Sequence, residues 1–162
     1  MKRQMETSAE RSAIMARVKS KDTTPEMIVR RLTFRLGYRY RLHDNRLPGK
    51  PDLVFPGRRK VIFVHGCYWH GHDCRAGRNR PASNLEYWNK KLSRNCERDK
   101  EHQKLLKKSG WNYLILWECE LKESGALEKR LRKFLGEDIR HIKRPLSHGR
   151  YVNLTTHKNQ NG

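Results

Sequence analysis

One ten-residue segment concentrates side chains that could do chemistry. The run from His65 to Cys74, HGCYWHGHDC, contains two cysteines and three histidines. Thiolates and imidazoles are the ligands that tetrahedral zinc prefers, and structural zinc sites use four of them. Cys67, His72 and Cys74 could supply three ligands from this one loop. The fourth ligand must then come from elsewhere, which would pin the loop to the rest of the fold.

The chain holds two further cysteines, either of which could complete such a site. Cys119 directly follows an apolar run typical of a buried strand, so the fold would fix its position. Cys96 is the competing candidate, but it lies in a charged segment expected to be helical. The alternative to a metal site is a set of unrelated thiols and surface imidazoles. Because dense Cys/His tracts in chains without a secretion signal usually bind metal, we favour zinc with Cys119 as its fourth ligand.

A carboxylate and the two remaining histidines lie close to the same segment. If His72 binds zinc, His65 and His70 flank the end of the apolar run 60–64, and Asp52 lies on the preceding expected strand. A carboxylate binds Mg²⁺, which stabilises charge developing on phosphate, and a histidine can deprotonate an attacking water. Together with a basic surface, this set predicts phosphodiester hydrolysis. The alternatives are a carboxylate that only stabilises a turn and histidines that only contact phosphate.

Aromatic residues are interleaved with these groups. Tyr68 and Trp69 lie in the loop and Trp88 lies just beyond it. Beside a basic groove, such rings offer stacking surfaces or wedges between bases. A polar loop has little core to fill, so we expect Tyr68 and Trp69 to be wedges. Trp111 and Trp117 lie in an expected strand, where core packing is the simpler interpretation.

The composition indicates a polyanionic partner. Among 162 residues, 37 are Lys or Arg and 17 are Asp or Glu, which gives a formal net charge of +20. Nucleic acid is the favoured partner, with an acidic membrane surface as the alternative. No apolar run approaches the roughly 20 residues needed to span a bilayer, and no secretion signal follows Met1. The length and the lack of repeats or long linkers favour one compact domain.

The elements that must position these residues follow from apolar periodicity and capping signals. Beyond a basic helix over residues 8–20, we expect a helix with Thr24 as its cap and Pro25 at its first position, ending at Gly37. Strands are predicted over 38–42, 51–55, 60–64 and 111–117, and helices over 84–108, with an interruption near Ser93, and over 124–136, with Ser124 as cap. This order predicts a mixed sheet with helices on both faces.

Five motifs in this order resemble the very-short-patch-repair (Vsr) DNA mismatch endonucleases over roughly residues 10–121. They are KDTTPE (21–26), LPGKPDLV (47–54), FVHGCYWHGHDC (63–74), NCERD (95–99) and WECEL (117–121). The resemblance implies an α/β fold with a restriction-endonuclease-like core, in which helices flank a mixed β-sheet, and a structural zinc site. It also implies an N-terminal basic DNA-contacting arm (1–20), a catalytic domain (21–136) with a zinc loop (65–80), and a basic irregular C-terminal tail (137–162).

The activity that the resemblance implies is strand-specific and Mg²⁺-dependent. Such enzymes nick double-stranded DNA on the 5′ side of the thymine in a T:G mismatch left by deamination of 5-methylcytosine. The resemblance further implies a monomer in the bacterial cytoplasm, associated with the nucleoid, with mismatch-repair proteins as candidate partners. The alternative is a zinc-stabilised DNA-binding module without catalysis. Asp52, His70 and Glu26 separate the two, because a pure binding module has no reason to assemble them.

The resemblance also assigns roles to particular residues. Asp52 would bind the catalytic Mg²⁺ with the backbone carbonyl of Val64, His70 would be the general base, His65 would contact the scissile phosphate, and Glu26 would hydrogen-bond the metal's water shell. The structural zinc would be held by Cys67, His72, Cys74 and Cys119. The residues that would enter the duplex beside the mismatch are Tyr68, Trp69, Trp88 and Met15.

The sequence departs from the wider nuclease pattern after Asp52. The usual second acid and lysine are missing, and Phe63, Val64 and His65 stand in their place. Histidines substituting for those groups are the expected variant in the narrower family. Cys96 receives no role from the resemblance and is expected to be a free thiol.

Overall fold

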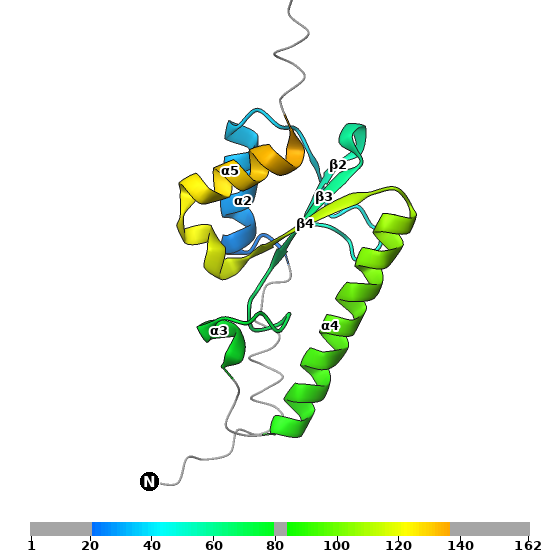
Figure 1. The fold of residues 1–162 in the computed structure, drawn as a ribbon, viewed down its shortest axis with the longest axis vertical. Helices are drawn as coiled ribbons and strands as arrows, with labels where there is room; N and C mark the ends of the chain where they lie inside the picture. Colours follow the sequence, from blue (N-terminus) through cyan, green and yellow to red (C-terminus); the bar gives the residue numbers. More distant parts are fainter. Residues whose placement is uncertain (1–20, 80–83, 137–162) are drawn as a thin grey trace, which may run out of the picture.

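The computed structural model describes residues 21–79 and 84–136 (Figure 1). The expected helix over 8–20, Met15 and the segment 137–162 lie outside the described residues. The elements are α2 (Thr24–Arg35), β1 (Arg41–Leu42), β2 (Leu53–Phe55), η1 (Pro56–Arg58), β3 (Lys60–His65), α3 (Arg75–Arg78), α4 (Leu85–Lys108), β4 (Asn112–Trp117), η2 (Glu118–Lys122) and α5 (Ser124–Leu135).

The four strands form one mixed sheet in the order β1-β2-β3-β4. β1, β2 and β3 pair antiparallel, whereas β3 and β4 run parallel over six residue pairs, from Lys60↔Asn112 to His65↔Trp117. A parallel pair needs a crossover connection, and α3 and α4 provide it. The predicted mixed sheet is therefore confirmed.

Helices cover both faces of the sheet. In Figure 1, α2 and α5 lie on one side and α4 lies on the other. Along β3, Ile62 packs into the cluster under α2 and α5, whereas Val61 and Phe63 pack with Leu106 of α4. Since alternate residues of a strand face opposite sides, His65 continues the row of Val61 and Phe63 toward α4. The fold thus turns a histidine at the end of a core strand toward α4.

The first strand is shorter than predicted. β1 contains only Arg41 and Leu42, and the prediction of a strand from residue 38 is wrong. The hydroxyl of Tyr38 instead donates to the Gly136 carbonyl (2.5 Å), and that of Tyr40 donates to the Arg30 carbonyl (3.0 Å). These two tyrosines tie the segment before β1 to α5 and α2, outside the ladder.

Both predicted caps and the predicted interruption also need correction. Thr23, not Thr24, caps α2, and its hydroxyl accepts from the Glu26 amide at 3.4 Å. Ser124 is the first residue of α5, because the first helical hydrogen bond is accepted by the Glu123 carbonyl. α4 continues through Ser93, whose hydroxyl donates to the exposed Glu97 carboxylate (3.1 Å) and leaves the helix backbone intact.

No helix in the described part of the chain is long and apolar enough to cross a membrane.

Candidate active site

Asp52 lies at the entrance to β2, against the end of β3. Its Oδ2 accepts a hydrogen bond from the Val64 backbone amide at 2.6 Å, which fixes the carboxylate. Burial raises the pKa of Asp52 to about 6; the Val64 amide opposes this rise and the charge of Glu26 reinforces it. The ionised form of this half-buried carboxylate is one that a bound cation would stabilise. This environment fits the oxygen ligand of a divalent metal.

His65 and His70 stack on each other beside this carboxylate. Their ring centroids lie 3.8 Å apart, with 12° between the ring planes. His65 is 7% exposed, and its Nδ1 has no hydrogen-bond partner among the described residues. Burial and the neighbouring His70 lower the pKa of His65 to about 4, so this ring is neutral at neutral pH.

Asp99 is a functional candidate that the sequence reasoning missed. Asp99 lies on α4, and its Oδ2 is 2.5 Å from Nδ1 of His70 in the loop after β3. Although burial opposes ionisation of Asp99, the contact with His70 keeps its pKa below the usual value. One turn earlier on α4, the side-chain amide of Asn95 donates to the backbone carbonyl of Trp69, and Cys96 Sγ donates to the backbone carbonyl of His70. The spacing of an amide and an acid four residues apart in NCERD was the available signal.

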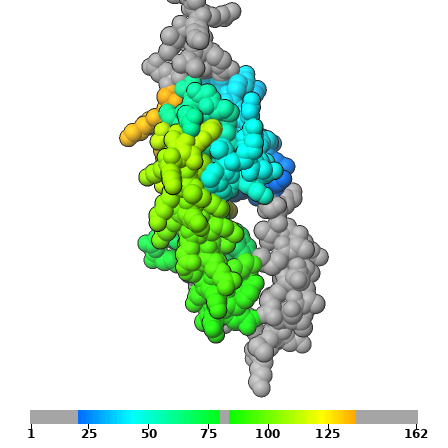
Figure 2. Space-filling model, turned by 90° about the vertical axis from the view of Figure 1, so that its right-hand side faces the viewer, coloured from blue at the N-terminus to red at the C-terminus, as the bar shows by residue number. Residues whose placement is uncertain are grey.

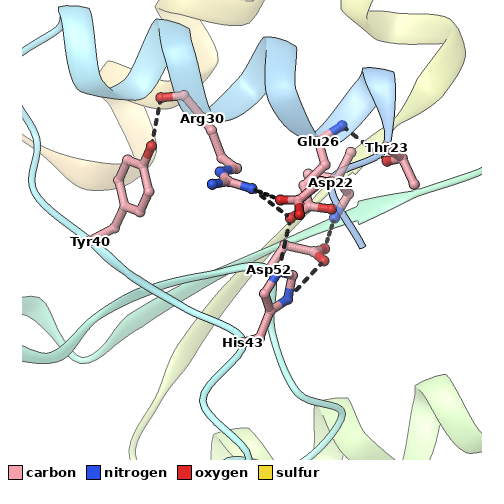
Figure 3. A network of polar contacts seen from close by, with 8 residues as sticks. Asp22, Thr23, Glu26, Arg30, Tyr40, His43 and Asp52 are labelled. Carbon is pink, nitrogen blue, oxygen red and sulfur yellow. Dashed lines mark hydrogen bonds and ion pairs between the residues drawn. The ribbon is translucent and has the colours of Figure 1, made fainter. Parts of the chain in front are cut away.

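A second network reaches Asp52 from α2 (Figure 3). Glu26 is 3% exposed, and its carboxylate contacts Arg30 (3.4 Å) and His43 Nε2 (3.1 Å). His43 Nδ1 in turn lies 4.0 Å from Asp52 Oδ1, and Arg30 also pairs with Asp22. Sequence reasoning selected Glu26 and Asp52 but not His43, which no motif marked.

One open cleft of about 820 Å³ is lined by His43, Asp52, His65, His70 and Asp99. Three cations, Lys21, Lys50 and Arg98, share its lining with Asp52, His65, His70 and Asp99. The cyan segment that contains residues 43–50 lies directly beside α4 in Figure 2, and a Cβ on Gly49 would come within 3.0 Å of His102. Carboxylates and imidazoles at the base, with cations around them, suit a phosphodiester substrate.

The four predicted zinc ligands come together a short distance away. The ligand atoms of Cys67, His72, Cys74 and Cys119 all lie within 4.8 Å of one another. The Gly77 amide donates to Cys74 Sγ at 3.3 Å, and this bond lowers the pKa of Cys74 to about 7. Burial and the neighbouring sulfurs of Cys67 and Cys74 raise the pKa of Cys119 to about 12.

This donor set fits a soft divalent cation. Three thiolates at this spacing repel one another unless a cation neutralises them, the imidazole adds a neutral nitrogen ligand, and the amide aimed at Cys74 favours the thiolate that ligates. Cys96 lies outside the cluster, as expected. Trp117, predicted as core, is only half buried and stacks on His72 (4.3 Å between ring centroids), because β4 ends between the cluster and the cleft.

The expected wedge residues form one aromatic group. Tyr68 and Trp69 meet at 4.9 Å between ring centroids, and Trp88 at the start of α4 lies 6.1 Å from Trp69. Tyr87, which sequence reasoning did not select, extends the group from Trp88 (5.3 Å) and is 58% exposed. Lys91 lies over three of these rings at 5.2–5.8 Å. The rings thus form a partly exposed aromatic platform, with Tyr87 the most exposed, that joins the loop after β3 to the start of α4.

Comparison with known proteins agrees with this chemistry. The sequence model of the family described as "DNA mismatch endonuclease Vsr" matches residues 4–76. A type II nicking enzyme of Xanthomonas oryzae pv. oryzae, V.XorIIP, is 51% identical over 125 residues, which cover 77% of this chain and 91% of that protein. The type II nicking enzyme V.NmeAIP of Neisseria meningitidis is 42% identical over 131 residues, which cover 81% of this chain and 93% of that protein.

The "DNA mismatch endonuclease Vsr" of Escherichia coli is 38% identical over 132 residues, which cover 78% of this chain and 84% of that protein. These identities extend over most of the length of each relative. The residues that the family model matches include Asp52 and the segment from His65 to Cys74. The chain belongs to the Vsr family and is a DNA endonuclease of the mismatch and nicking type.

Proposed function

We propose that this endonuclease is Mg²⁺-dependent and nicks one strand of double-stranded DNA on the 5′ side of the thymine in a T:G mismatch left by deamination of 5-methylcytosine. The observation that carries the proposal is one cleft that holds a fixed, half-buried carboxylate (Asp52), an imidazole with its own acid (His70 with Asp99) and three cations. The core would be restriction-endonuclease-like, with the catalytic domain over residues 21–136.

Asp52 is our candidate for the carboxylate that holds Mg²⁺, with the backbone carbonyl of Val64. Its burial and raised pKa support this role, since a bound cation would favour the ionised form. When bound, Mg²⁺ would stabilise the negative charge that develops on the phosphate. Glu26 would accept hydrogen bonds from the metal's waters at the same edge of the cleft.

His70 is our candidate for the general base. It would take a proton from the attacking water, while Asp99 would orient the ring and stabilise the imidazolium that forms. His65 is neutral at neutral pH and offers a single N–H donor, which we assign to the scissile phosphate. Lys21, Lys50 and Arg98 would bind flanking phosphates.

We assign a structural zinc to Cys67, His72, Cys74 and Cys119. Three of these residues come from the loop 65–80 and one from η2, so the metal would hold this loop to the end of β4. The position of His70 between Cys67 and His72 means that the same metal would help to fix the base.

We propose that Tyr68, Trp69 and Trp88 enter the duplex beside the mismatch, with Met15 from the arm 1–20 entering on the other side. Their partly exposed platform supports this, and a mismatched step costs less to unstack than a paired one. The protein would act as a monomer on DNA, with mismatch-repair proteins as candidate partners. The basic segment 137–162 would be a tail beyond the catalytic domain.

A strand-resolved cleavage assay with Mg²⁺ tests the proposal. Duplexes that carry T:G, T:A or C:G in a panel of methylation-site contexts would be compared, with Asp52→Asn as the inactive control. We expect a nick confined to the thymine strand of T:G duplexes. Cleavage of matched duplexes at the same rate, or no dependence on Mg²⁺, would contradict the proposal.

A further inference from the structure

His43 stands between the carboxylates of Glu26 and Asp52. Its Nε2 lies 3.1 Å from Glu26 Oε1, and its Nδ1 lies 4.0 Å from Asp52 Oδ1. Figure 3 shows the imidazole reaching toward both acids from the loop that follows β1. Among residues 21–79 and 84–136, it is the side chain with ion-pair contacts to both Glu26 and Asp52.

The strand register explains how His43 comes to this place. β1 and β2 pair antiparallel, with Arg41 opposite Val54 and Leu42 opposite Leu53. Continued by one residue, this register sets His43 opposite Asp52. The backbone of His43 then turns into the left-handed region (φ 47°), which residues with a Cβ rarely adopt. The turn ends the strand and delivers the ring to the cleft, where His43 is part of the lining.

The two acids need such a residue because they repel each other. The charge of Glu26 is one of the causes that disfavour ionisation of Asp52. Arg30 offsets Glu26 from the far side, where it also pairs with Asp22. Among the described residues, His43 is the one that lies between Glu26 and Asp52 and contacts both, so its ring can fix their separation. An imidazole has two nitrogens at opposite edges of a rigid ring, which suits it to hold two groups at a set distance.

We propose that His43 is a positioning residue that holds Glu26 and Asp52 at the separation that a divalent cation needs, and so sets the affinity of the cleft for the metal. This proposal rests on the proposed function, in which Asp52 is the metal carboxylate. His43 is within hydrogen-bond distance of Glu26 and meets Asp52 through a longer ion-pair contact. Outer partners of this kind orient metal ligands and tune their affinity, and their loss typically weakens binding 10- to 100-fold.

The test compares three full-length, zinc-loaded variants with the unchanged protein: His43→Ala, His43→Gln and Asp44→Ala. Glutamine keeps an N–H donor within reach of Glu26. Asp44 is the matched control, because its carboxylate accepts three hydrogen bonds from Arg46 in the same loop and touches neither acid. Thermal unfolding followed by circular dichroism checks that each variant is folded.

The first readout is binding of Mn²⁺ in the absence of DNA, followed by the electron paramagnetic resonance signal of the free ion. We expect His43→Ala to weaken Mn²⁺ binding by about tenfold, His43→Gln to retain most of the affinity, and Asp44→Ala to bind as the unchanged protein does. Unaltered affinity in His43→Ala would overturn the proposal. Equal weakening in Asp44→Ala would overturn it too, by assigning the effect to the loop.

The second readout is nicking of a T:G duplex as a function of Mg²⁺ concentration. We expect the Mg²⁺ concentration for half-maximal rate to rise by about the same factor in His43→Ala, with the rate at saturating Mg²⁺ retained. If His43→Ala instead lowered the rate at saturating Mg²⁺ and left the Mg²⁺ dependence unchanged, His43 would act on the DNA substrate. If His43→Gln failed to restore Mn²⁺ binding, the imidazole itself would be a metal ligand. The unchanged protein could bind Mn²⁺ and yet fail to nick T:G duplexes. The proposed function would then be wrong, and the comparison of Mn²⁺ affinities among the variants would still test the role of His43.

Discussion

His70 Nδ1 and Asp99 Oδ2 lie 2.5 Å apart, although 29 residues separate them in the chain. The contact joins the loop after β3 to the middle of α4, and Asn95 and Cys96 reinforce it through bonds to the loop backbone. An acid bound to one ring nitrogen fixes the tautomer and leaves the other nitrogen for the reaction. The helix that crosses from β3 to β4 therefore also supplies the acid that contacts our candidate base.

Replacing Asp99 by Asn should reduce nicking by about 100-fold or more while leaving binding of T:G duplexes within a few-fold, because the imidazolium loses its stabilising charge. Single-turnover cleavage and equilibrium binding would be measured on the same protein. Glu97→Gln is the control, since Glu97 is exposed on the same helix and its carboxylate bonds Ser93. Equal rates for Asp99→Asn and the unchanged protein would remove Asp99 from the mechanism.

Replacing Asp52 by Asn should abolish nicking and yet stabilise the protein at pH 8 without added Mg²⁺. The folded pKa of Asp52 is raised from 3.8 to about 6, so its favourable contribution is complete below pH 3.8 and is lost as the pH rises through 6. Above pH 6 the ionised group costs at most about 3 kcal/mol, a cost that Asn avoids while still accepting from the Val64 amide.

Urea unfolding at pH 8 and at pH 4, with zinc retained, measures this difference. We expect the stabilisation to shrink toward zero at pH 4. Asp44→Asn serves as the control of opposite sign. In the unchanged protein, hydrogen bonds from Arg46 lower the pKa of the Asp44 carboxyl to about 2, so this carboxylate stabilises the fold above pH 3.8 and stops doing so as the pH falls. A destabilised Asp52→Asn at pH 8 would show that the carboxylate is structural.

Local patterns predicted the framework of the fold. The Pro25 and Glu26 start of α2, the β-branched run that became β3 and the leucines of α5 all carry their signals within a few residues. The cysteine cluster was also predictable, because three of its members lie within eight residues of one another and Cys119 follows a buried strand.

Contacts between distant segments were not predictable. The short β1 results from the hydroxyls of Tyr38 and Tyr40, which bond to α5 and α2, and no local pattern encodes those partners. His43 lies in an unremarkable loop, and only the β1–β2 register brings it to Asp52. Trp117 is a large apolar residue of the kind that fills cores, but β4 ends at this residue and the Trp117 ring stacks on His72.

The cysteine cluster should hold one zinc ion per chain, and Cys119→Ser should lose it. Elemental analysis and native mass spectrometry measure the content, and urea unfolding measures the accompanying loss of stability, since metal binding contributes directly to folding. Cys96→Ser is the matched control, because Cys96 lies outside the cluster and serine can still donate to the His70 carbonyl. Full zinc content in Cys119→Ser would refute this ligand set.

Gly77→Ala should also lose zinc. A Cβ at this position would come within 1.9 Å of the His72 carbonyl oxygen and 2.9 Å of the Cys67 carbonyl, so the backbone of the cleft loop would have to shift. Gly125→Ala is the contrast, because no atom lies within 4 Å of its added Cβ and alanine favours the helix by up to about 1 kcal/mol. Zinc content and thermal unfolding compare the two. Unchanged zinc in Gly77→Ala would mean that the loop tolerates the shift.

Trp69→Ala should lower the affinity for T:G duplexes by about 10- to 100-fold and change the affinity for matched duplexes much less. A stacking ring contributes about 1–3 kcal/mol per base, and only a mismatched step opens cheaply enough to admit it. Fluorescence anisotropy with both duplexes measures the ratio of affinities, at fixed salt because phosphate contacts depend on it. Phe34→Ala is the control, since it removes an exposed ring from α2 that does not line the cleft. An equal loss on both duplexes would make Trp69 a general DNA contact.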